Sequence, residues 1–174
     1  MAWGVERRGL GSLESYHQHG HTGYAWAARR DLLQRHGLYD ANILGNGDLN
    51  IAQAFFAGCL YLRTDRLRPA ASRHLMSWAE RIFSSVRGSV ASLPGVLYHL
   101  WHGDKRDRLY DRRLQVLVEH DYDPAVDIRL APTGAYAWAT DKPGLHAWCR
   151  DYFGLRREDA RGVAEKSAPL NKLC

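Results

Sequence analysis

The middle of the chain carries a run of apolar residues at helical spacing, and this run constrains the fold more than any other feature. The apolar positions recur at intervals of three and four residues, which is the period of one face of an α-helix. They are Leu75, Met76, Ala79, Ile82, Phe83 and Val86. The pattern predicts an amphipathic helix from about Ser72 to about Arg87 whose apolar face covers a hydrophobic core.

Shorter patterns predict four further helices and little extended structure. These helices span residues 28–36, 49–57, 105–120 and 143–153. Gly37 and Gly58 end the first two, since glycine readily adopts the left-handed conformation that closes a helix. Residues 96–101 have the composition of a strand. Helices interleaved with short strands predict an α/β or α+β fold.

The composition is that of an ordinary domain. The 174 residues are 45% hydrophobic and 25% charged, and no apolar run approaches the roughly 18 residues that cross a bilayer. We therefore expect neither secretion nor membrane insertion, and the charged start lacks the apolar stretch of a signal peptide. The three cysteines are far apart, without the spacing of zinc ligands, which favours a reduced, cytoplasmic protein.

The domain organisation follows from the same patterns. We expect an irregular N-terminal segment at residues 1–21, one folded domain at 22–155 and a charged tail at 156–174. The net charge of +5 and the predicted pI near 9.3 favour anionic partners such as phosphates, without identifying one.

A pair of histidines at the end of the strand-like segment is a candidate metal site. His99 and His102 are three residues apart, and a straight strand would point them to opposite faces. Gly103 allows the bend that would bring both imidazoles to one ion, and Asp104 offers a carboxylate beside them. The alternative is that both histidines are packed or hydrogen-bonded for structural reasons.

A glycine-rich loop, Gly45-Asn46-Gly47-Asp48, leads into the helix predicted for residues 49–57. The acidic residue at its end has two interpretations. Asp48 could cap the helix N-terminus through its carboxylate, or it could act as a general base on a loop thin enough for a substrate to approach.

A basic segment and several aromatic residues are further candidates for ligand binding. Lys105 and Arg106 begin a basic run, extending to Arg113, that could neutralise a diphosphate or follow a nucleic-acid backbone. Aspartates alternate with these residues, so the run could equally be a solvated helix face. Trp26 and Trp101 lie near the motifs in the sequence, where their rings could stack on a sugar or belong to the core.

In their order along the chain, these motifs resemble the C-terminal half of glycosyltransferases of the GT-A fold, in particular the β-1,4-galactosyltransferase group and related bacterial and phage enzymes. That family has a G-x-x-x-x-x-R segment, a hydrophobic pair, G-[LF], a G-x-G-[ED]-D loop and later an M-x-x-H or H-x-x-H segment before a basic stretch. The matching segments here are Gly23–Arg29, Leu32-Leu33, Gly37-Leu38, Gly45–Asp48, His99–His102 and Lys105-Arg106. The resemblance covers residues 22–115.

The resemblance implies a partial GT-A fold and a metal-dependent, inverting sugar transfer. The donor would be a nucleotide-sugar, such as a UDP-sugar, and the acceptor a hydroxyl of a carbohydrate or a glycosylated molecule. Asp48 takes the place of the catalytic base, and His99 and His102 take the places of ligands to Mn²⁺ or Mg²⁺. The residues expected to contact substrate are Gly45, Gly47, Trp26, Trp101, Lys105 and Arg106.

The chain also departs from the family pattern. Leu49 stands where a second acid usually follows Asp48, and no D-x-D motif precedes the glycine loop. We therefore expect a fragment that lacks the nucleotide-binding half. Two alternatives stay open: a basic nucleic-acid-binding module that uses the helix around Lys105 to Arg113, and an inactive carbohydrate-binding remnant.

Overall fold

The computed structural model describes residue 22, residues 25–98, residue 100 and residues 103–158. Its helices are α3 (Arg30–His36), α4 (Gly47–Ala57), α5 (Pro69–Val86), α6 (Tyr110–Glu119), α7 (Pro124–Asp127) and α8 (Pro143–Leu155). The described part also has two 3₁₀ turns, η2 (Thr64–Arg66) and η3 (Lys105–Arg108), and an antiparallel hairpin of β1 (Ile128–Leu130) and β2 (Tyr136–Trp138). Helices combined with a small sheet confirm the expected α/β or α+β class.

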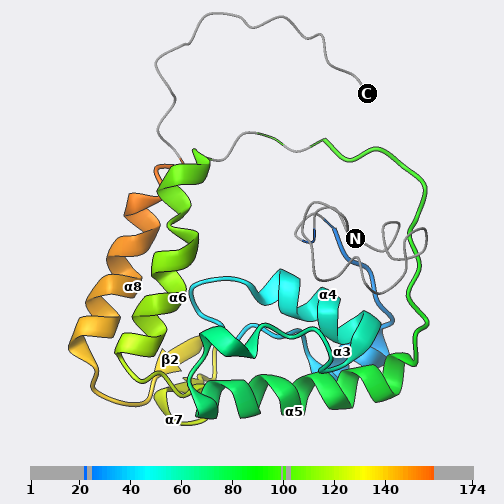
Figure 1. Cartoon of the computed structure of the whole chain (residues 1–174), viewed down its shortest axis with the longest axis horizontal. Coiled ribbons are helices and arrows are strands. Elements are labelled where there is room, and N and C mark those ends of the chain that lie inside the picture. Colours follow the sequence, from blue (N-terminus) through cyan, green and yellow to red (C-terminus); the bar gives the residue numbers. More distant parts are fainter. Residues whose placement is uncertain (1–21, 23–24, 99, 101–102, 159–174) are drawn as a thin grey trace, which may run out of the picture.

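Helix α5 forms the base against which α3 and α4 pack (Figure 1). The predicted apolar stripe is buried at Leu75, Ala79, Ile82 and Val86. Met76 and Phe83, which also belong to the pattern, lie at its exposed border. The Phe83 ring lies so close to Gly58 that a Cβ there would be 3.1 Å from it. Gly58 therefore both ends α4, as predicted, and makes room for α5.

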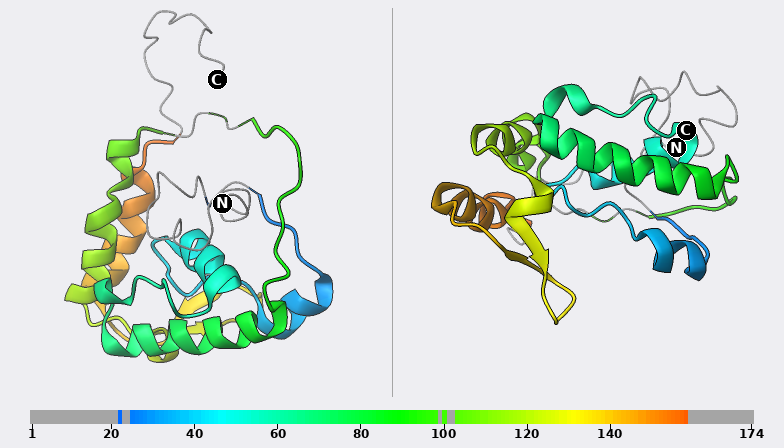
Figure 2. Two further views of the ribbon diagram at one scale, coloured as in Figure 1. Left: turned by 45° about the vertical axis from the view of Figure 1, so that its right-hand side comes forward. Right: turned by 90° about the horizontal axis from the view of Figure 1, so that it is seen from below.

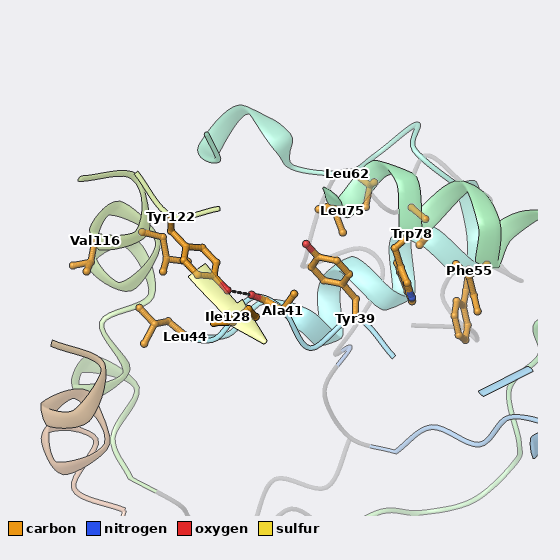
Figure 3. Close-up of a cluster of buried hydrophobic side chains, with 14 of the residues drawn as sticks. Tyr39, Ala41, Leu44, Phe55, Leu62, Leu75, Trp78, Val116, Tyr122 and Ile128 are labelled. Atoms are coloured by element: carbon orange, nitrogen blue, oxygen red, sulfur yellow. Dashed lines mark hydrogen bonds between the residues drawn. The ribbon is translucent and has the colours of Figure 1, made fainter. Parts of the chain in front are cut away.

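The core joins α5 to the segment that precedes the glycine loop (Figure 3). The rings of Tyr39 and Trp78 lie 5.3 Å apart, and the Trp78 indole N–H donates to the His36 carbonyl at 3.0 Å. At the other end of the core, the Tyr122 hydroxyl donates to the Ala41 carbonyl at 2.8 Å. These two bonds give hydrogen-bond donors to the backbone oxygens of His36, at the end of α3, and of Ala41, in the segment before the glycine loop.

Helices α6 and α8 run side by side and rise from one end of α5 (Figures 1 and 2). Trp148 and Tyr152 of α8 stack on one another with ring centroids 5.1 Å apart. The Tyr152 hydroxyl donates to the Arg108 carbonyl and accepts from Arg113 of α6. The helix pair therefore depends on polar contacts as well as on apolar packing.

Two predictions for the segment from residue 96 to residue 120 are wrong. The helix expected over residues 105–120 is divided into η3 and α6, because Leu109 between them is left-handed, with a φ of 47°. The strand expected over residues 96–101 is not formed at residues 96–98 or 100, which are exposed. A strand needs a partner for its backbone groups, and the segment runs along the outside of the molecule (Figure 1).

A buried aspartate anchors the hairpin to the helices. Asp127 is 1% exposed and accepts from the Asp123 N–H, the Thr140 hydroxyl and the Lys142 ammonium, the last at 2.7 Å. Burial by itself would raise the pKa of Asp127, but these hydrogen bonds and the Lys142 charge outweigh it and lower the pKa. These contacts explain the buried Asp127 carboxylate as a structural residue.

Candidate functional site

The glycine loop is thin because neighbouring groups approach both of its glycines. Gly45 has a φ of 122°, and a Cβ there would lie 2.6 Å from the Arg113 guanidinium. A Cβ on Gly47 would lie 2.8 Å from the Tyr39 carbonyl oxygen. Internal packing therefore accounts for Gly45 and Gly47, which the family resemblance assigns to substrate contact. That assignment stays a prediction.

Asp48 does not cap α4, so the capping interpretation is wrong. The residue before the helix is Asn46, in the left-handed conformation with a φ of 67°, and it makes no side-chain capping bond. Asp48 instead lies inside the first helical turn and is exposed. Its Oδ2 accepts a hydrogen bond from the Thr22 hydroxyl at 3.0 Å. Asn46 is one of the few residue types that tolerate this backbone conformation, so the helix starts earlier than the sequence pattern predicts.

The segment before α3 brings Trp26 to the same face of α4 as Asp48. The Trp26 indole N–H donates to the Thr22 carbonyl at 2.8 Å, and its ring meets the Phe55 ring edge-on, with centroids 5.6 Å apart. Phe55 lies two turns beyond Asp48, so the two share a helix face. We call Thr22, Trp26, Asp48 and Phe55 the Asp48 cluster. In this cluster Thr22 contacts both the partly exposed indole of Trp26 and the exposed carboxylate of Asp48.

Arg113 supports the loop from behind. Its side chain is buried, and it donates to the Asn46 side-chain oxygen at 2.9 Å and to the Tyr152 hydroxyl at 3.2 Å. Its guanidinium also lies over the Tyr110 ring, 4.6 Å from the centroid. Within the described residues no carboxylate pairs with it. The sequence prediction of a mostly solvated arginine face missed this residue.

The other arginines of η3 and α6 lie in ion pairs, whereas none of the ion pairs among the described residues involves Lys105. Lys105 and Arg106 are exposed on η3, and Arg106 contacts Asp104 and Asp107 at 3.4 and 3.6 Å. Further along, Arg108 pairs with Glu158 and Arg112 with Glu119. This arrangement agrees with the charge-compensated face and gives the nucleic-acid alternative no extended unpaired basic surface in the described part of η3 and α6.

The proposed metal ligands His99 and His102, and also Trp101, lie outside the described residues. Next to them, Gly103 adopts a φ of 94°, and a Cβ there would lie 2.7 Å from the Arg156 carbonyl oxygen. Asp104 contacts Arg106. Within the described residues no group of three or more histidine, cysteine, aspartate or glutamate side chains could hold a metal ion. The metal site stays a prediction.

None of the helices in the described part of the chain is both long and apolar enough to span a bilayer. Comparison of the chain with protein-family models, with curated proteins and with solved structures found no match.

Proposed function

We propose that the chain is the acceptor-side part of a glycosyltransferase, in which Asp48 deprotonates the acceptor hydroxyl. One observation supports this most directly: Thr22 contacts both the exposed carboxylate of Asp48, at the end of the glycine loop, and the partly exposed Trp26. A carboxylate and an indole together suit a sugar, since the carboxylate accepts a hydroxyl proton and the ring packs against apolar sugar carbons.

The two carboxylate oxygens of Asp48 have different roles in this proposal: one is held by a hydrogen bond, and the other accepts the proton. Oδ2 accepts from Thr22, whereas Oδ1 has no hydrogen-bond partner within the described part of the chain. In the proposed step Oδ1 takes the acceptor proton while the hydroxyl oxygen bonds to the anomeric carbon. The bond from that carbon to the nucleoside diphosphate breaks, and the diphosphate leaves with the electron pair. Attack opposite the leaving group inverts the anomeric centre.

The donor in this proposal is a nucleotide-sugar, with a UDP-sugar as the first choice. Lys105 and Arg106 are exposed and basic, which suits contact with a diphosphate. His99 and His102 would hold Mn²⁺ or Mg²⁺, and such an ion supplies Lewis-acid stabilisation of the leaving diphosphate when bound. We place the protein in the cytoplasm, where the free thiols of Cys59 and Cys149 would stay reduced.

The test is a transfer assay on the chain joined to the nucleotide-binding half that it is expected to lack, with UDP-sugars, Mn²⁺ and a panel of carbohydrate acceptors, monitored by release of UDP. Asp48→Asn should abolish release, because the amide cannot accept the proton. Asp31→Asn is the matched control, since Asp31 is also an exposed acid in the first turn of its helix. Equal loss in both variants, or equal activity of Asp48→Asn and the wild type, would remove Asp48 as the base.

A further inference from the structure

A small cavity lies beside the N-terminal half of α4, on the opposite side from the Asp48 cluster. Its volume is about 80 Å³. Its walls include Asn42, Asn46, Leu49, Asn50, Arg63 and Arg66. Asn46 and Asn50 are one helical turn apart, whereas Asp48, between them in sequence, points about half a turn away. The cavity is therefore separate from the surface used in the proposed transfer, and a ligand bound in it would be independent of that function.

Two buried carboxamides in the wall lack a partner among the described residues. Asn42 is 7% and Asn50 is 4% exposed, and within that part of the chain neither side chain makes a hydrogen bond. Asn46, by contrast, accepts from Arg113. The polar atoms of neither side chain are fully buried, since the described side chains with a buried, unpartnered nitrogen or oxygen do not include Asn42 or Asn50. Both carboxamides are therefore open to the cavity and are available to hydrogen-bond a polar ligand there.

The charges around the cavity indicate an anion. Arg63 and Arg66 both line it, and none of the described acidic residues does. Their carboxylate partners, Asp65 and Asp111, lie on the solvent side, with side chains 62% and 92% exposed. The first turn of α4 also borders the cavity, and the N–H groups and dipole of a helix N-terminus favour negative charge. Arginine, amide N–H and helix N–H groups are the donors that bind oxyanions.

The size restricts which anion fits. Sites for drug-sized ligands are about 300–1,000 Å³, so this cavity of about 80 Å³ has room for a single small group. A phosphate group has four oxygens that can accept from several donors at once. We propose that the cavity between α4 and η2 binds a phosphate group, either as inorganic phosphate or as the phosphate of a small monoester.

Inorganic phosphate is the first probe, titrated into the full chain by calorimetry and by amide NMR. We expect saturable binding that shifts the amide signals of Asn46 and Asn50. The double variant Arg63→Gln/Arg66→Gln should weaken the binding at least about ten-fold, since it removes two charge-assisted donors. Both arginines are half-exposed on the surface, so the fold should persist. Asn50→Leu should also weaken the binding, because it replaces a donor by an apolar group.

The matched control is Arg35→Gln/Arg112→Gln, which removes the same charge from two ion-paired, exposed arginines elsewhere. Equal weakening in both double variants would mean general attraction to a basic protein and would overturn the site. Absence of saturable phosphate binding together with absence of binding to ribose 5-phosphate would overturn it as well. Tighter binding of the monoester than of inorganic phosphate would identify the phosphate as part of a larger ligand.

Discussion

The guanidinium of Arg113 donates to the side-chain oxygen of Asn46 across 2.9 Å, and so connects α6 to the loop from which α4 starts. Asn46 is held in the left-handed conformation at this point, and Asp48 follows two residues later. The position of the candidate catalytic carboxylate therefore depends on a residue far away in the sequence. Burying the Arg113 guanidinium costs free energy, because its hydrogen-bond partners among the described residues are neutral. We infer that its contacts fix the conformation of the glycine loop.

Replacement of Arg113 by alanine tests this dependence. The change removes hydrogen bonds to Asn46 and Tyr152 and the packing on Tyr110. We expect the free energy of unfolding to fall by about 2 to 3 kcal/mol, since buried partners are left unsatisfied. Urea denaturation measures the loss. Arg112→Ala, the adjacent and exposed arginine, is the control, and a loss as large in that variant would contradict the role of Arg113.

Gly45→Ala tests the same contact from the other side. The substitution places a Cβ against the Arg113 guanidinium in a backbone conformation that alanine rarely adopts. We expect destabilisation of about 1 to 3 kcal/mol, measured by thermal and urea unfolding. Gly95→Ala, where a Cβ would meet nothing within 4 Å, should have little effect. If Gly45→Ala were neutral, the close approach of Arg113 to the loop would be wrong.

Helices with a strong local pattern were predictable from the sequence. The ends of α3 and α4 at Gly37 and Gly58 are confirmed, with φ values of 63° and 61°. Their termination is a local property of the backbone, and glycine signals it in any context. The stripe on α5 was predictable for a related reason, because burial of one helix face follows directly from the period of the apolar residues.

The site could be predicted only in part, because its geometry depends on contacts between distant segments. The exposed Asp48 at the glycine loop was identified, but its Thr22 partner lies 26 residues earlier. The sequence pattern predicted that Arg113 lies on the solvent-exposed face of its helix, because charged side chains are usually exposed. Its spacing of four from Leu117 and three from Val116, both buried, was the signal that could have placed it inside.

The buried Asp127 should make stability depend on pH. Its pKa in the folded protein is lowered from 3.8, so the folded state binds this proton less readily than the unfolded state does. The resulting stabilisation is present above the unfolded value and is lost as the pH falls through the lower folded value. Unfolding by urea at pH values from neutral to well below the unfolded pKa of an aspartate should show Asp127→Asn less stable than the wild type at neutral pH. The difference should shrink in acid, and a constant difference would contradict the assignment.

Thr22→Val tests whether the hydroxyl positions the candidate base. Thr22 is buried, and valine has nearly the same shape, so the fold should persist while Oδ2 of Asp48 loses its donor. If Asp48 is the base, the freed carboxylate spends less time oriented towards the acceptor. We expect kcat in the transfer assay to fall about ten-fold, less than the effect of removing a general base altogether, while KM for the donor changes little. Thr22→Ser keeps the hydroxyl and should restore the rate. A Thr22→Val variant that unfolds at the wild-type temperature and transfers at the wild-type rate would show that the Thr22 contact is structural only. A variant with lowered kcat that Thr22→Ser does not rescue would place the defect in packing rather than in the orientation of Asp48.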